Sequence, residues 1–221
     1  MDIRLLAATD APALWDFETA HRAYFEQWVQ ARSARFYTAE GFAEEMEASL
    51  QRQQQDQAFH YLMWEGQRLA GRINLTQVRR PYFHSAALGY RVAPDCGGRG
   101  LASQAVAAVL HQAFTTHGLQ RIEAIARPEN PASVRVLCKQ GFVQFGHSRR
   151  SMELNGQWFD LLHFEAHRPQ KGRRGGGTTP AFGTGLKRFF QPRTSHRLHT
   201  GSCMLPLPAK PSARQALGVP W

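Results

Sequence analysis

The pattern of hydrophobic and polar positions over the first 165 residues predicts short strands that alternate with helices. Runs rich in aromatic and branched residues, bounded by turn signals, are typical of strands. Such runs cover residues 2–6, 58–64, 69–75, 85–92, 121–126, 143–153 and 158–165. The dipeptide Asn155-Gly156 between the last two runs is a strong hairpin signal, so we expect these two strands to pair.

Helices are expected between these strands. Thr9 and Asp10 ahead of Pro12 predict a helix start with a side-chain cap. Apolar residues four positions apart predict a second helix around residues 42–50, and similar spacing predicts helices over 101–118 and 131–140. The order of elements therefore predicts a mixed α/β domain with hairpins at both ends and a strand–helix–strand unit in the middle.

The formal net charge of +10 suggests nucleic-acid binding, but its source lies at one end of the chain. Ten of the 27 Lys and Arg residues follow Glu165, and none of the 17 Asp and Glu residues does. The first 165 positions are therefore neutral overall, and the basic character belongs to the C-terminal segment.

That segment, residues 169–221, holds seven of the 12 prolines and eight of the 19 glycines without a sustained period. We expect residues 1–168 to form one domain and the basic, Gly/Pro-rich tail to be largely disordered. Two interpretations of the tail stay open. It is either a solvated extension without a specific function or a basic arm that makes weak contacts with RNA.

The cysteines and the hydropathy of the chain indicate in which cellular compartment the protein is expected. Cys96, Cys138 and Cys203 lack the spacing of a zinc site or a disulfide framework, which predicts reduced thiols. The chain has no apolar run long enough to span a membrane and no signal-peptide pattern at its N-terminus. We expect a cytoplasmic protein without membrane contact, either a monomer or a homodimer.

A glycine-rich loop, with Gly97, Gly98 and Gly100, joins the expected strand 85–92 to the helix that begins at Leu101. Such a loop lets main-chain amides approach a ligand, and the helix N-terminus adds partial positive charge. The loop lacks the Gly-Lys-Ser/Thr of a P-loop, and Ser103 stands where a dinucleotide fingerprint needs glycine. It predicts a phosphate site, with a simple helix-capping turn as the alternative.

Three blocks resemble the GNAT superfamily of acetyl-coenzyme A-dependent N-acetyltransferases. They are Gly97-Gly98-Arg99-Gly100-Leu101-Ala102, similar to the Gln/Arg-x-x-Gly-x-Gly/Ala signature, then Asn130-Pro131-Ala132-Ser133 with Gly141-Phe142, and Leu154–Asp160. The third block and residues 83–90 resemble the ribosomal-protein-alanine N-acetyltransferase (RimJ/RimL) branch. The resemblance covers residues 1–168, and Gly97 departs from the signature, which prefers Gln or Arg there.

The resemblance implies the GNAT fold, a mixed, mostly antiparallel seven-stranded sheet with helices on both faces and splayed fourth and fifth strands. It implies that Ser133 protonates the departing thiolate of coenzyme A and that Asn130 flanks the thioester. A first-turn role for Ser133 and an N-cap role for Asn130 are the alternatives. The residues implied to bind acetyl-CoA are Tyr90, Arg91, Val92, Gly97, Gly98, Arg99, Gly100, Leu101, Ala102, Asn130 and Ser133.

No residue is an obvious general base. The RimL-type glutamate aligns with Met152, and Glu153 would point to the other face of its strand. Glu123 is the candidate kept, with a surface charge on its strand as the alternative, ahead of His60 and His84. Because the pKa of an α-amine is about 7.7–8.0 and that of lysine about 10.4, a missing base favours an N-terminal amine as acceptor.

The sequence therefore predicts an enzyme that transfers acetyl from acetyl-CoA to a primary amine by direct attack in a ternary complex. The expected acceptor is the N-terminal α-amine of a protein, such as a ribosomal protein. Two alternatives stay open, namely an acetyltransferase for a small-molecule amine such as an antibiotic or toxin, and a non-catalytic coenzyme A-binding module with an RNA-binding tail.

Overall fold

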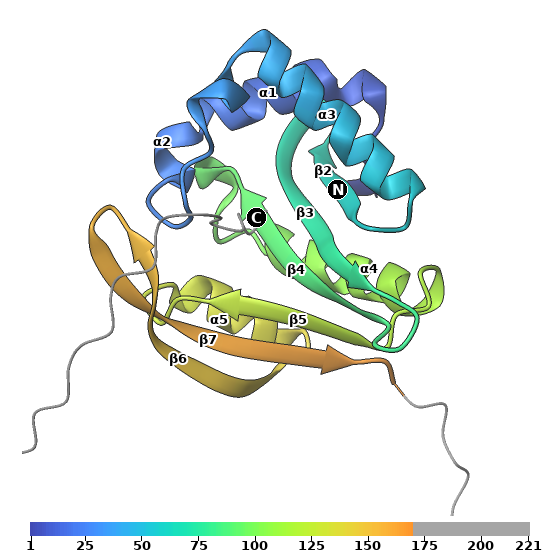
Figure 1. Ribbon diagram of the computed structural model, residues 1–221, viewed down its shortest axis with the longest axis vertical. Coiled ribbons are helices and arrows are strands. Elements are labelled where there is room, and N and C mark those ends of the chain that lie inside the picture. Colours follow the sequence, from blue (N-terminus) through green and yellow to red (C-terminus); the bar gives the residue numbers. More distant parts are fainter. Residues whose placement is uncertain (170–221) are drawn as a thin grey trace, which may run out of the picture. The chain divides into compact units, whose positions relative to one another are not determined.

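A computed structural model of the protein describes residues 1–169 (Figure 1). These residues form a seven-stranded sheet in the order β1-β2-β3-β4-β5-β7-β6. The strands are β1 (Asp2–Leu5), β2 (Phe59–Glu65), β3 (Arg68–Arg79), β4 (Ser85–Val92), β5 (Arg121–Ala126), β6 (Val143–Leu154) and β7 (Gln157–His167). Neighbouring strands are antiparallel except β4 and β5, which are parallel because α4 connects them.

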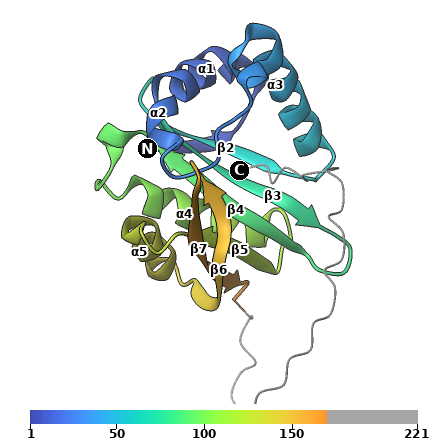
Figure 2. The ribbon, with the colours of Figure 1, turned by 60° about the vertical axis from the view of Figure 1, so that its left-hand side comes forward.

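Helices cover both faces of the sheet (Figures 1 and 2). The α-helices are α1 (Ala11–Ala20), α2 (Arg22–Phe25), α3 (Ala39–Gln54), α4 (Leu101–Thr115) and α5 (Pro131–Lys139). Short 3₁₀ turns η1 (Ala8–Asp10), η2 (Ala34–Tyr37) and η3 (Pro94–Cys96) connect elements. This arrangement confirms the predicted fold class, a mixed, mostly antiparallel sheet between two layers of helices.

Alternation along the strands creates a core on each face. Met63 of β2 packs with the apolar face of α4, whereas its neighbour Leu62 packs with α1 and α3. The α4 side of the core also takes Leu137 of α5, and the other side takes Phe17 of α1 and Phe42 of α3. The two helical layers therefore meet opposite faces of the same central strands.

The predicted elements agree with the structure, apart from details that depend on contacts distant in sequence. Asp10 does not cap α1, because its carboxylate accepts from the main-chain amide of Ala7 at 2.9 Å and from Arg4. The helix begins where predicted, with Pro12 in its first turn, but the prediction of a side-chain cap was wrong. Helix α2 has only four residues and was not predicted, since so short a segment shows no period.

Residues 170–221 lie outside the described part, so the predicted disorder of the tail, its RNA contact and the domain boundary stay predictions. No helix within residues 1–169 is long and apolar enough to cross a membrane.

Candidate functional site

Strands β4 and β5 part near their carboxyl ends (Figure 1). Their pairing begins at Ser85 with Arg121 and ends at Leu88 with Ala124. Beyond that point β4 continues along β3 as far as Val92, while β5 continues along β7 as far as Ala126. Main-chain groups of residues 89–92 that would face β5 therefore lack strand partners among the described residues, which confirms the predicted splay.

The glycine-rich loop lies directly after the parted end of β4. Gly98 and Gly100 adopt positive φ angles of 72° and 81°, which glycine accepts without strain, and Gly100 is the N-cap of α4. The amide of Gly97 donates to the carbonyl of Pro94, and within residues 1–169 the next amide along the chain with a main-chain acceptor is that of Gln104, which donates to Gly100. The amides from Gly98 to Ser103 are left as donors for an anion at the helix N-terminus.

A pair of hydroxyl groups bridges the parting from β4 to α5. The hydroxyl oxygens of Tyr90 and Ser133 are 2.9 Å apart. The Asn130 side chain accepts from the amide of Ser133 at 3.0 Å and caps α5, and Pro131 follows it in the first turn. Burial raises the pKa of Tyr90, and its hydrogen bond with Ser133 offsets this only in part, so the phenol stays protonated at neutral pH.

Residues 1–143 match the family model described as an acetyltransferase (GNAT) domain. The chain belongs to the GNAT acetyltransferase family. It is 33% identical over 160 residues to the probable N-acetyltransferase YjcK of Bacillus subtilis, an alignment that covers 72% of this chain and 88% of that protein. It is 26% identical over 160 residues to the [ribosomal protein uS5]-alanine N-acetyltransferase of Escherichia coli, which covers 72% and 82% of the two chains.

Solved structures support the same assignment. The ribosomal-protein-S5-alanine acetyltransferase from Vibrio fischeri aligns with a TM-score of 0.73 at 25% identity, over 76% of this chain and 93% of that chain. The spermidine N-acetyltransferase from Vibrio cholerae, solved with coenzyme A and spermine, aligns with a TM-score of 0.63 at 20% identity, over 76% and 95%. The second likeness shows a shared fold.

The parted strands and the loop of this acetyltransferase fit acetyl-CoA, the acyl donor of the family. The free amides from Gly98 to Ser103 suit a diphosphate, and the unpaired edge of residues 89–92 suits the amide groups of an extended arm. The residues predicted to bind acetyl-CoA thus come together around one parting. Their individual roles stay predictions.

The structure gives little support to the prediction that the Arg99 side chain binds acetyl-CoA. Its guanidinium makes two hydrogen bonds, of 2.9 and 2.8 Å, with the carboxylate of Glu65 at the end of β2. The side chain is half exposed. Arg99 therefore ties the loop to the β2–β3 hairpin, and the main-chain amides are left as the principal anion donors.

Glu123 is not placed as a free base. Its carboxylate pairs with Arg79 at 2.7 Å and also with Arg121. Glu123 lies opposite Ala87 in the parallel register, so it shares the face of Ala87, whereas Tyr90 lies on the other face. The geometry gives no support to the prediction that Glu123 is catalytic.

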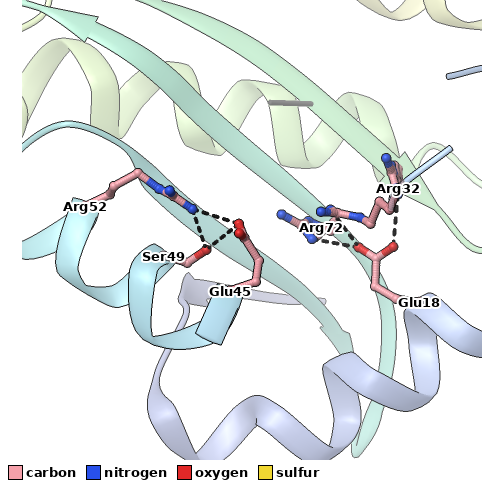
Figure 3. Close-up of polar contacts among 7 residues, drawn as sticks. Glu18, Arg32, Glu45, Ser49, Arg52 and Arg72 are labelled. Atoms are coloured by element: carbon pink, nitrogen blue, oxygen red, sulfur yellow. Dashed lines mark hydrogen bonds and ion pairs between the residues drawn. The ribbon is translucent and has the colours of Figure 1, made fainter. Parts of the chain in front are cut away.

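Sequence reasoning missed a buried ionic cluster, which we call the Glu18 cluster, and Figure 3 shows Glu18, Arg32 and Arg72 of it. It consists of Glu18 on α1, Arg72 on β3, Arg91 on β4 and Arg32 in the segment between α2 and η2. Glu18 is fully buried. Burial alone would raise its pKa, but attraction to the arginines outweighs this and lowers it, so the carboxylate is ionised at neutral pH. Arg91 was predicted only as a cofactor contact, and no local motif marks its partners.

Arg127 joins the two sides of the parting. It directly follows β5, donates from Nη1 to the carbonyl of Gln27 at 3.1 Å, and lies 3.5 Å from the ring centroid of Phe159 on β7. The segment after α2 is thereby held against the β6–β7 hairpin. On that hairpin, Arg150, Gln157 and Trp158 line a shallow surface depression.

Proposed function

We propose that this acetyltransferase acetylates the N-terminal α-amine of a protein. The observation that carries the proposal is the hydroxyl pair of Tyr90 and Ser133 at the parted strands, without a free carboxylate from Glu18 or Glu123. An acceptor with a pKa of about 7.7–8.0 is partly neutral at pH 7 without a strong base, whereas a lysine side chain is not. The similarity to ribosomal-protein-alanine acetyltransferases supports the same acceptor class.

Bound acetyl-CoA supplies an acetyl group activated as a thioester. In our proposal the amides from Gly98 to Ser103 hold its diphosphate, and the edge of residues 89–92 orients its arm along β4. As the neutral acceptor amine attacks the thioester carbonyl and the carbon–sulfur bond breaks, Ser133 would donate its proton to the departing sulfur and regain one from the amine nitrogen, which loses it on becoming an amide. Tyr90 would hold the Ser133 hydroxyl in place from the opposite wall. Asn130 acts through the cap that fixes the first turn of α5.

The main competitor is a small-molecule amine as acceptor. The shared fold with a spermidine acetyltransferase motivates this alternative. Membership of an enzyme family, in turn, disfavours the non-catalytic coenzyme A-binding module considered from the sequence.

The test is release of coenzyme A thiol with acetyl-CoA and a matched set of acceptors. The first is a lysine-free peptide that begins with a free alanine, the second carries an acetylated N-terminus and one internal lysine, and the third is spermidine. We expect turnover with the first peptide and little with the other two. Turnover confined to spermidine or to lysine would refute an N-terminal acceptor. Mass spectrometry of protein N-termini from cells with and without the enzyme would then name the natural substrate.

A further inference from the structure

The Glu18 cluster holds more positive charge than its carboxylate neutralises. Glu18 accepts from Arg72 at 2.6 Å and from Arg91 at 2.9 Å, and these two bonds occupy both of its oxygens. The nearby carboxylate of Glu45 is taken by Arg52 at 2.7 Å (Figure 3). One carboxylate thus serves the three guanidinium groups of the cluster.

Arg32 is the least satisfied of these arginines. Its nearest carboxylate oxygen, on Glu18, is 3.5 Å away, and its buried Nε has no hydrogen-bond partner among residues 1–169. The guanidinium lies 4.2 Å from the ring centroid of Phe36, which gives it an aromatic support but no acceptor. Burial and repulsion by Arg72 lower the pKa of Arg32 to about 10. A largely buried cation without a full partner is costly unless an anion joins it.

The cluster lies across β4 from the hydroxyl pair of Tyr90 and Ser133. Arg91 follows Tyr90 on the parted segment of β4, so the two side chains project to opposite faces of the strand. The Tyr90 face meets Ser133, and the Arg91 face meets α1 and Phe25 of α2. The three arginine side chains remain 11–16% exposed, so part of each is accessible to solvent.

We propose that Arg32 binds an anionic group on the acceptor, so that the preferred substrate is an N-terminal segment with an acidic side chain close to its free amine. This inference rests on the proposed acetylation of protein N-termini. The acceptor carboxylate completes the pairing of Arg32 that Glu18 leaves unfinished. The same positive charge would disfavour a polyamine as acceptor.

The test compares lysine-free peptides that begin with alanine and carry either a single Glu or a single Gln at position 2, 3 or 4. For the wild-type enzyme we expect kcat/KM to be about tenfold higher with Glu at the best position, the size of one charge-assisted hydrogen bond, through a lower KM. The preference should shrink as salt is added.

Arg32→Met removes the charge and keeps an apolar chain over Phe36, and should abolish the preference between the Glu and Gln peptides. Arg32→Lys should retain part of it, which guards against a variant that merely misfolds. Arg22→Met is the matched control, because it removes the same charge from an exposed pair with Glu26 on the neighbouring helix and should keep the preference.

The outcomes separate the two proposals. Equal use of Glu and Gln peptides by the wild type, or a preference that survives Arg32→Met, overturns the anion site and leaves N-terminal acetylation standing. Failure to acetylate any free N-terminus, with turnover of spermidine instead, overturns both.

Discussion

The two faces of β4 at its parted end carry different kinds of chemistry. On the Tyr90 face the binding groups are main-chain amides of a glycine-rich loop and a hydroxyl pair set by the first turn of α5. On the Arg91 face they are long charged side chains from α1, β3 and the segment after α2, joined by Glu18. The Tyr90 face, where we propose that acetyl-CoA binds and which we call the cofactor face, is thus built largely from backbone. The Arg91 face, where we propose that the acceptor binds and which we call the acceptor face, is built from side chains distant in sequence.

The difference teaches where specificity resides. Amides at a helix N-terminus fit a diphosphate, and the diphosphate is the same whichever acceptor is used. We therefore expect that face to contribute little to the choice of acceptor. An arginine cluster can change by single substitutions without disturbing the loop. We therefore expect mutations on the Tyr90 face to change catalysis and cofactor affinity. Mutations on the Arg91 face should instead change stability and the choice of acceptor.

The largest effect should come from the cofactor face. Ser133→Ala removes the proposed proton donor and should lower kcat by about 10²–10³-fold, with little change in the KM for acetyl-CoA. Tyr90→Phe keeps the Ser133 hydroxyl and should cost less. Thiol release at saturating substrate measures both. A wild-type kcat in the Ser133→Ala variant would show that Ser133 is not the proton donor.

On the acceptor face the main effect should be on folding. Glu18→Gln leaves the buried arginines without their carboxylate and should reduce the free energy of unfolding by about 3–5 kcal/mol. Glu44→Gln, at an exposed pair with Arg35, is the control and should leave the urea midpoint unchanged. Equal midpoints for the two variants would contradict a stabilising cluster.

The carboxylate of Glu18 also makes the stability of the fold depend on pH. The pKa of Glu18 is lower in the folded protein than its ordinary value of 4.5, so the ionised form stabilises the fold fully above that value. This stabilisation is lost as the pH falls through the folded-state pKa. Urea unfolding from pH 6 to pH 2 should therefore show a steeper loss for wild type than for Glu18→Gln, and parallel curves would exclude the linkage.

A smaller effect is expected in the glycine-rich loop. Gly100 has a φ of 81°, so Gly100→Ala should strain the backbone by about 1–2 kcal/mol and weaken coenzyme A binding by about tenfold. Gly146→Ala on β6 makes the same change at a position with ordinary contacts to His163 and is the control. Calorimetric titration of coenzyme A compares them, and equal affinities would mean that the loop amides do not hold the diphosphate.

The smallest effect is expected at Glu123. Because Arg79 and Arg121 already bind its carboxylate, Glu123→Gln should change kcat/KM by less than twofold. A pH–rate profile of the variant is the sensitive readout. If the acid limb of the pH–rate profile disappeared in the variant, Glu123 would be the general base after all.

The comparison also explains what the sequence could predict. The loop from Gly97 to Ala102 and the Asn130–Ser133 block are contiguous, and their chemistry depends on local backbone geometry, so pattern alone located them. The bounds of β4 and β5 were predicted as observed for the same reason.

The Glu18 cluster could not be found in this way. Arg72 and Arg91 are 54 and 73 residues from Glu18 along the chain, and their meeting depends on how α1 packs across the sheet. Asp10 fits the sequence pattern of a helix cap, but the competing partner Arg4 lies on another element. Glu123 was chosen for its residue type, whereas its arginine neighbours are visible only in the fold.

Hydrogen exchange with mass spectrometry tests the central claim, the division of labour across β4, most directly. Coenzyme A alone should protect the amides of residues 98–103 and 89–92, and leave α1 and α2 unchanged. A dead-end N-acetylated product peptide should then add protection on α1, α2 and the segment that contains Arg32. Two results would contradict the account. One is protection of both faces by coenzyme A alone, and the other is that coenzyme A protects neither the glycine-rich loop nor β4.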